Sequence, residues 1–167
     1  LREHEIAAIT EDGPNVFLPL FKTEIVLLSS RKLTSPSKRS ISAREAANLP
    51  IVYYNEAVLN SIIDDFFGNE KLKSPVRLHT TNTERLMQYL QSGDYATFTD
   101  GFSRLLSGDA MEGKVICHLR PETYAYVGAF VEQGLDANTP QMRYCNDLLR
   151  RLHAIAPTYM RKNAFTL

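Results

Sequence analysis

The sequence predicts an α/β fold, because strand-like and helix-like segments alternate three times between residues 51 and 107. In each repeat, an apolar run of strand composition leads to a residue of the kind that caps helices, and apolar residues at helical spacing follow. Such alternation implies right-handed crossovers between parallel strands. The pattern therefore favours a parallel sheet with helices packed against it.

The first repeat starts with the apolar segment 51–54. Asn55 follows at the capping position, and Gly68 with Asn69 ends the helical pattern. The spacing between them predicts a helix over residues 56–67, with a single apolar face. The apolar residues on this face are Val58, Leu59, Ile62, Ile63, Phe66 and Phe67.

The second repeat combines a strand over residues 75–79 with a helix that runs to Gly93. The helix is predicted to start at Thr81-x-x-Glu84, a capping-box pattern. In such a box, the Thr81 hydroxyl accepts from the Glu84 backbone N–H while the Glu84 carboxylate accepts from the Thr81 N–H.

The third repeat has a strand over residues 95–99. Asp100 follows it, and we expect this residue to cap a short helix. The apolar residues of that helix are Phe102, Leu105 and Leu106.

The elements before the repeats are strands followed by a polar crossover. Residues 5–10 have strand composition and end in a turn, and core strand material follows at 17–20 and 25–28. Residues 29–41 are polar and form the crossover. Ser42-x-x-Glu45 is a second capping-box pattern and predicts a short helix.

The elements after the repeats are two strands and one amphipathic helix. A return crossing over residues 107–113 leads to strands over 114–119 and 123–131. Thr139 followed by proline predicts a helix start, and a clean apolar stripe continues to Pro157. The remaining residues show no period, and we interpret them as a tail or a packing extension.

Polar residues follow the three predicted parallel strands at their carboxyl ends, where open α/β sheets bind ligands. Helix N-termini at this edge offer backbone N–H groups and a partial positive charge, so we expect a small polar ligand, anionic rather than cationic. The alternative is that these residues only cap helices. They are Asn55, Thr80, Thr81, Asn82, Asp100 and Gly101.

Composition excludes several classes of function for this segment. Its net charge is zero, with 19 Lys and Arg against 19 Asp and Glu, so it lacks the basic face that supplies non-specific DNA affinity. The basic cluster Arg31, Lys32, Lys38 and Arg39 is interpreted as a solvated loop. No stretch approaches the ~18 apolar residues of a membrane span.

The sequence gives little evidence for a catalytic site or a metal site. Cys117 and His118 are neighbours, and a strand would point their side chains to opposite faces. Cys145 falls on the apolar stripe and is expected to be a small core residue. The histidines and cysteines are not spaced as metal ligands usually are, so we expect no metal or cofactor. The two cysteines lie far apart in the sequence, which suits a reducing cytoplasm.

Two passages carry a resemblance to a known family. Residues 19–28, then a polar stretch, then residues 41–52 resemble the middle of the effector-binding domain of LysR-type transcriptional regulators, where the chain crosses between two subdomains. The order of elements matches over about residues 3–156. Where the family has G-x-G-x-x-x-x-P, this chain has Gly93 to Asp100, with Tyr95 and Asp100 in place of the second glycine and the proline, so this edge of the pocket is expected to be more polar.

The resemblance implies a two-subdomain fold like that of type 2 periplasmic binding proteins, incomplete at the N-terminus. Subdomain I would comprise residues 1–30 and 113–167, subdomain II would comprise residues 31–112, and the two would flank the effector cleft. Thr10 matches a residue that often faces the effector, although a local turn explains it equally well. Together with residues at the carboxyl edge of the predicted sheet, it gives the predicted effector contacts Thr10, Thr80, Thr81, Asn82, Asp100 and Gly101.

The functional expectation is the ligand-sensing part of a bacterial transcriptional regulator. Because Leu1 is not an initiator, we interpret the chain as a fragment, with DNA bound only through a missing N-terminal winged helix-turn-helix domain. The family implies a homodimer or tetramer, with helix 56–67 in the dimer interface. Two alternatives stay open: a solute receptor of a transport system, which a signal peptide upstream would indicate, and a small α/β enzyme.

Overall fold

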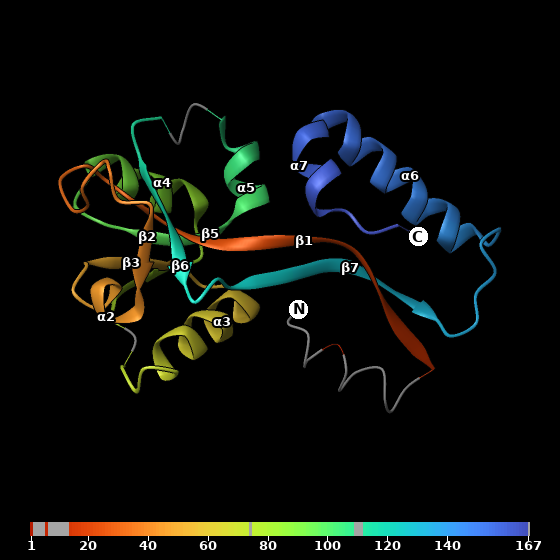
Figure 1. Ribbon diagram of the computed structural model, residues 1–167, viewed down its shortest axis with the longest axis horizontal. Helices are drawn as coiled ribbons and strands as arrows, with labels where there is room; N and C mark the ends of the chain where they lie inside the picture. The colour runs from red at the N-terminus through yellow and green to blue at the C-terminus, as the bar shows by residue number, and fades with distance from the viewer. Residues whose placement is uncertain (2–5, 7–13, 74, 109–111, 167) are drawn as a thin grey trace. The chain divides into compact units, whose positions relative to one another are not determined.

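A computed structural model describes Leu1, Ile6 and residues 14–73, 75–108 and 112–166 (Figure 1). The chain divides into two compact units. Unit 1 comprises Leu1–Thr23 with Tyr124–Leu167, and unit 2 comprises Glu24–Thr123.

The sheet of unit 2 is mixed. Its strands are β2 (Ser40–Ser42), β6 (Val115–Arg120), β1 (Asn15–Ser29) and β5 (Thr97–Asp100), in that order. β2 runs parallel to β6, whereas β1 runs antiparallel to both β6 and β5. The sequence pattern did not predict these antiparallel pairs, because only the repeats between residues 51 and 107 carry a parallel signature.

A second, two-stranded sheet consists of β3 (Ile51–Tyr54) and β4 (Val76–Thr80), and the start of the third repeat lies beside β3. β3 pairs with β4 in parallel, and a parallel bridge joins Ile51 to Ala96. The Val52 N–H donates to the Ala96 carbonyl at 2.9 Å, which places β3 beside the chain that enters β5. The predicted α/β fold with parallel repeats is confirmed for these strands.

Four helices belong to unit 2 and follow the strands in the predicted order. They are α2 (Ala43–Ala46), α3 (Ala57–Gly68), α4 (Thr83–Ser92) and α5 (Gly101–Leu106). In α3 the apolar residues Ile62, Ile63, Phe66 and Phe67 are buried, whereas Val58 and Leu59 are half-buried.

Aromatic residues hold α3 on the sheet. The Phe98 ring of β5 lies 6.1 Å from the Phe66 ring and 6.0 Å from the Phe67 ring, and it stacks at 6.1 Å on Tyr53 of β3. Burial of one such ring stabilises the fold by roughly 2–3 kcal/mol. The apolar spacing of the first repeat therefore reflects packing on its own sheet.

Three predicted helix caps are confirmed. Ser42 and Glu45 form the capping box of α2. The Asp100 side chain caps α5. Thr139 caps α6 (Pro140–Ile155).

Two predicted caps are wrong by one residue. The Asn55 N–H donates to the Thr80 carbonyl at 2.8 Å, which extends the β3–β4 pairing past Tyr54, so Glu56 becomes the cap of α3. The Thr80 hydroxyl accepts from the Asn82 N–H at 3.1 Å, and this turn makes Asn82 the cap of α4 in place of Thr81. Pairing across the sheet decided the first position, and a local turn decided the second.

Unit 1 pairs β1 with β7 (Tyr124–Glu132) and, within the residues that the structure describes, carries the helices α6 and α7 (Pro157–Asn163). The residues after Pro157, which have no sequence period, form α7 and an extension. Met160 of α7 is completely buried, and the Phe165 N–H donates to the Leu20 carbonyl at 2.9 Å. The extension is thus held by packing and by strand-like bonding to β1.

The unit boundaries lie at Thr23/Glu24 and Thr123/Tyr124, whereas the sequence interpretation drew them at 30/31 and 112/113. The difference arises because residues 25–28 of β1 pair with β5, and residues 115–118 of β6 pair with β1 inside unit 2.

Among the described residues, no helix has the length and apolar character that crossing a bilayer requires.

Candidate ligand-binding site

The carboxyl ends of the parallel strands of unit 2 lie at one edge of the sheet. Tyr54, the last residue of β3, pairs with Thr80, the last residue of β4. Since Ile51 is bridged to Ala96 in parallel, β5 ends at the same edge. Asp100 at the end of β5 is paired with Ile25 of β1, so the antiparallel strand enters unit 2 at this edge too.

Five of the six predicted effector contacts lie at this edge, and Thr10 lies outside the described residues. Thr80 ends β4, Thr81 and Asn82 form the turn into α4, and Asp100 and Gly101 join β5 to α5. The two groups are separated by β3, which corresponds to two strand spacings or ~10 Å. A small ligand could therefore contact both groups at once.

The turn between β4 and α4 is locally ordered. The Asn82 side-chain Oδ1 accepts from the Arg85 N–H at 3.0 Å, and the Thr80 hydroxyl is bonded within the turn. Thr81, which takes no part in the cap, has an exposed side chain. The side chains of Thr80 and Asn82 are thus held within the turn, and the side chain of Thr81 is exposed to solvent.

Carboxylates of the chain itself occupy two of the helix N-termini at this edge. Asp100 Oδ1 accepts from the N–H groups of Phe102 and Ser103 at 3.0 and 2.9 Å. The Glu56 carboxylate accepts from Val58 and Leu59 at 3.0 and 2.6 Å. These N–H groups are the ones that would attract an anion. Because they are taken, the N-termini of α3 and α5 do not favour an anionic ligand, whereas the N-terminus of α4 is capped only by the neutral Asn82 side chain.

Asn60 is a polar residue of this region that the sequence reasoning did not identify. Its Nδ2 donates to Asn55 Oδ1 at 3.2 Å, which ties the first turns of α3 to the end of β3. Its Oδ1 is buried and has no hydrogen-bond partner among the described residues. An unpaired buried acceptor of this kind costs about 1–3 kcal/mol. The sequence signal that could have identified Asn60 is its polar side chain near the N-terminus of a helix whose other residues on that face are apolar.

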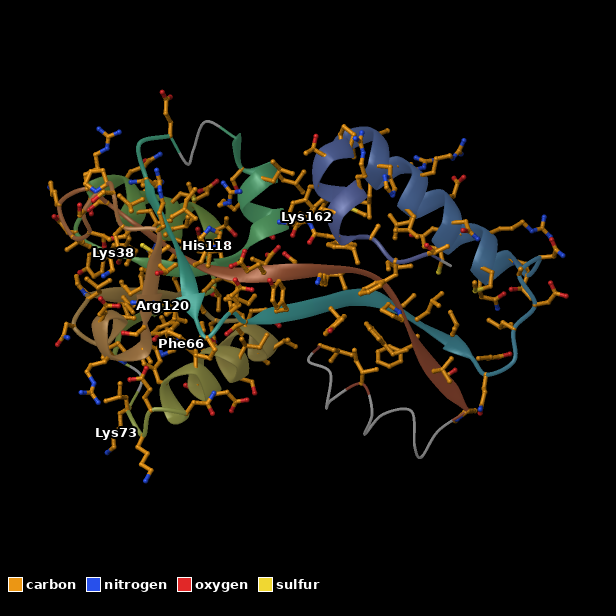
Figure 2. All side chains as sticks on the ribbon, in the orientation of Figure 1. Lys38, Phe66, Lys73, His118, Arg120 and Lys162 are labelled. Atoms are coloured by element: carbon orange, nitrogen blue, oxygen red, sulfur yellow. The ribbon has the colours of Figure 1, made fainter. Side chains whose placement is uncertain are left out.

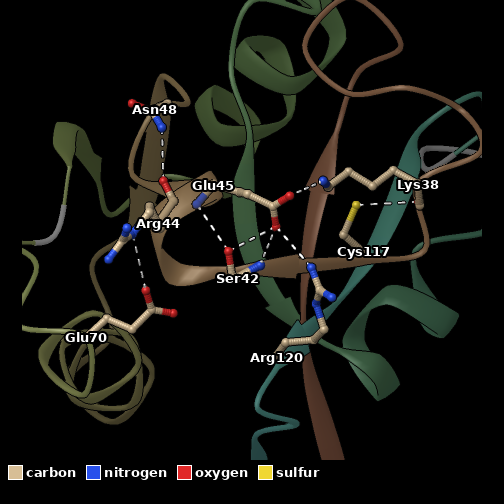
Figure 3. Close-up of polar contacts among 8 residues, drawn as sticks. All are labelled: Lys38, Ser42, Arg44, Glu45, Asn48, Glu70, Cys117 and Arg120. Atoms are coloured by element: carbon tan, nitrogen blue, oxygen red, sulfur yellow. Dashed lines mark hydrogen bonds and ion pairs between the residues drawn. The ribbon is translucent and has the colours of Figure 1, made fainter.

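A second polar cluster lies where β2, α2 and β6 meet (Figure 3). Glu45 accepts from the Lys38 ammonium at 2.6 Å, from the Ser42 N–H at 2.8 Å and from the Arg120 guanidinium at 3.3 Å. The hydrogen bonds from Lys38 and then from Ser42 lower the pKa of Glu45 from 4.5 to about 2. The cluster fixes α2 to the end of β6.

The described side chains do not form the Cys/His pair considered from the sequence. Cys117 is completely buried, and burial raises the pKa of its thiol. His118 projects from the other face of β6, where its Nδ1 lies 2.7 Å from Glu24 Oε1. Cys145 is buried on α6, as predicted. Within the described ranges, His, Cys, Asp and Glu form no group of three that could hold a metal ion.

Neither a family model nor a curated protein matches the chain. Solved structures do. The effector-binding domain of QuiR in complex with shikimate matches with a TM-score of 0.63 at 14% identity, over 87% of this chain and 68% of that chain. A variant regulatory domain of MetR, a LysR family regulator from N. meningitidis, matches with a TM-score of 0.68 at 14% identity, over 86% and 67%.

Full-length CbnR complexed with its target DNA also matches, with a TM-score of 0.61 at 6% identity, over 89% of this chain and 55% of that chain. These likenesses establish the fold: the chain has the fold of the regulatory domains of LysR-family proteins. It spans about half to two thirds of the length of these structures. The predicted fold class is confirmed.

Proposed function

We propose that this chain is the effector-sensing part of a bacterial LysR-type transcriptional regulator. The fold supports this proposal, as does the resemblance of residues 19–52 to the family. The observation that carries it is the shared edge of β3, β4 and β5, where Thr81 is exposed. Such an edge is where open α/β sheets take their ligands.

The effector we propose is a small polar molecule that donates hydrogen bonds. The acceptors at this edge are the exposed Thr81 hydroxyl and the carboxylates of Asp100 and Glu56, whose charges would repel a carboxylate-bearing ligand. Hydroxyl or amine groups would suit these acceptors. The proposal includes no cofactor, no metal and no catalytic step, in keeping with the buried Cys117.

A thermal-shift screen of small metabolites tests the site. At least one compound should stabilise the chain in a concentration-dependent manner, because a ligand that binds only the folded state raises its stability. Thr81→Val should abolish this shift. Thr158→Val, which alters an exposed threonine on α7 of unit 1, is the matched control and should leave the shift unchanged. An equal shift in the Thr81 variant would place the site elsewhere.

The proposal assigns DNA binding to a part of the protein outside this chain. The net charge is zero, and counterion release requires a basic surface. We therefore expect no salt-dependent mobility shift of duplex DNA by this chain alone. A retardation that weakens steeply with added salt would contradict this assignment.

As a regulator the protein would act in the cytoplasm and as an oligomer, through homodimers or tetramers in which effector binding alters the DNA-binding domain. Two buried free thiols, Cys117 and Cys145, suit a reducing compartment. The resemblance to the family implies an interface on α3, whose apolar stripe comprises six residues. Four residues of that stripe pack inward, so a contact there would depend on the half-buried Val58 and Leu59.

A further inference from the structure

The C-terminal end of α4 is bound by side chains that come from elsewhere in the chain. The last carbonyl groups of a helix have no partner within it, and α4 has no basic residue in its own last turn to meet them. The Ser30 hydroxyl donates to the Gly93 carbonyl, 63 positions away. The Lys114 ammonium donates to the Leu90 carbonyl, 24 positions away. A cation at this end also interacts favourably with the helix dipole.

A further lysine, Lys32, reaches the same end of α4 but is poorly shielded from water. Its ammonium lies 3.3 Å from the Ser92 carbonyl oxygen and 3.4 Å from Asp94, and its side chain is 69% exposed. Solvent screens contacts of this kind. Lys114 is half-buried, and its partner is the carbonyl of Leu90, a buried residue. Lys114 is therefore the better shielded ionic anchor of the helix.

Apolar packing holds α4 less firmly than it holds α3. Among the residues of α4, all of which the structure describes, only Leu90 is buried, whereas α3 buries four apolar residues. The first turn of α4, residues 83–85, is exposed. Leu90 belongs to the last turn, and the ring of Tyr89 beside it lies 5.2 Å from the Tyr95 ring. The contacts that hold α4 are thus concentrated at its C-terminal end.

The anchors of α4 stand on paired strands. Lys114 directly precedes β6, the strand on which Figure 2 labels His118. The first residue of β6, Val115, pairs antiparallel with Ser29 at the end of β1. Ser30 directly follows Ser29, so both anchors adjoin the same pair of strand ends. The C-terminal end of α4 is therefore attached to the mixed sheet of unit 2.

The opposite end of α4 adjoins the candidate ligand site. The helix begins directly after the turn that contains Thr81, and β4 holds this turn from its other side through the pairing of Thr80 with Tyr54. A helix of ten residues is ~15 Å long, so Lys114 is too far away to touch a ligand at Thr81. Because a helix transmits motion as a rigid element, release of its C-terminal end lets it swing about the Thr81 turn.

We propose that Lys114 is a positioning residue of the candidate ligand site, which acts through α4 on the conformation of the Thr81 turn. The inference rests on the proposed function, because it concerns the same site. When the anchor is lost, the turn keeps its binding conformation in only a fraction of the molecules, and the apparent affinity falls in proportion to that fraction. Lys114 thus controls ligand binding without a contact to the ligand.

Amide chemical shifts of the chain without any ligand test this role. Lys114→Met removes the ammonium and keeps the apolar stem. We expect the ¹H–¹⁵N cross-peaks of Thr81 and Thr83 to move in this variant, and Lys114→Arg, which restores a cationic donor, to return them toward their wild-type positions. Lys32→Met is the matched control, because it removes the exposed lysine at the same end, and should leave both cross-peaks in place.

The core of α3 is the internal reference for this experiment. The cross-peaks of Ile62 and Ile63, which are buried there, should not move. Shifts confined to the residues around Leu90 would overturn the proposal, since Lys114 would then only prevent fraying of the last turn. Equal shifts in α3 and α4 would overturn it too. If Lys114→Met does not fold, Lys114→Gln, which keeps a neutral donor, provides the same comparison.

Calorimetric titration separates this inference from the proposed function. The probe is a compound whose stabilising effect in the thermal-shift screen depends on Thr81. Its Kd should be several-fold higher for Lys114→Met than for the wild type. An unchanged Kd would overturn the positioning role and leave the proposed function intact. If no compound depends on Thr81, the proposed function fails, and the cross-peaks of Thr81 and Thr83 still decide whether Lys114 positions the turn.

Discussion

Glu45 and Lys38 form an ion pair in which the carboxylate Oε1 lies 2.6 Å from the ammonium nitrogen. The same carboxylate accepts from Ser42 and Arg120 through its other oxygen, so one side chain ties three segments of unit 2 together. Hydrogen bonds to the ionised form favour it, which explains the pKa of about 2.

Glu45→Gln should lower the free energy of unfolding at neutral pH by about 1 kcal/mol, because the side chain is 40% exposed and solvent screens the pairs. The folded-state pKa lies below the ordinary value of 4.5, so this stabilisation is complete above pH 4.5 and is lost as the pH falls toward 2. Urea unfolding at pH 7 and pH 3 measures the effect. The difference between wild type and variant should shrink at pH 3, and a constant difference would contradict the ionic origin.

Gly128→Ala should destabilise unit 1. A Cβ at this position would lie 2.2 Å from the Leu18 carbonyl oxygen and 2.6 Å from the Phe17 ring. Relief of such a clash requires a shift of the β1 backbone, which costs about 1–3 kcal/mol. Thermal unfolding is the measurement, with Gly68→Ala as the control, since nothing lies within 4 Å of its added Cβ. If the two variants melt at the same temperature, β1 and β7 lie further apart at this position than these distances indicate.

Substitutions in the turn before α4 distinguish the cap from its neighbour. Asn82→Ala should lower the free energy of unfolding by ~1 kcal/mol, because it removes the acceptor of the Arg85 N–H. Thr81→Ala should change it by less than ~0.5 kcal/mol, as is usual for exposed positions. Denaturant titration of both variants provides the comparison. If Thr81→Ala lowers the free energy of unfolding more than Asn82→Ala does, the result would support the capping box at Thr81 that the sequence predicted.

Met160→Ala should destabilise the chain by about 2–4 kcal/mol, because its side chain is completely buried on α7. Arg161→Ala, at the adjacent exposed position, is the matched control and should be near neutral. Chemical denaturation of both variants measures the cost. A neutral Met160 variant would mean that α7 contributes little to the core of unit 1.

Local chemistry was sufficient to predict much of this fold. Strands 51–54 and 75–79 and the helices after them follow from apolar spacing, and Ser42, Asp100 and Thr139 cap their helices because a short polar side chain reaches the N–H groups of the same turn. The edge at which β3, β4 and β5 end followed from the same alternation. All of these interactions join residues close in sequence, so the sequence alone determined them.

Interactions between distant residues decided the rest. The strand pairing of Asn55 with Thr80 moved the cap of α3 to Glu56, and this carboxylate, together with Asp100, changed the charge of the candidate site. Burial of Met160 turned an aperiodic tail into α7. On α6, packing covers Cys145 and leaves Tyr144 exposed, because a linear pattern records apolar residues and only the assembled fold determines which of them remain in contact with water.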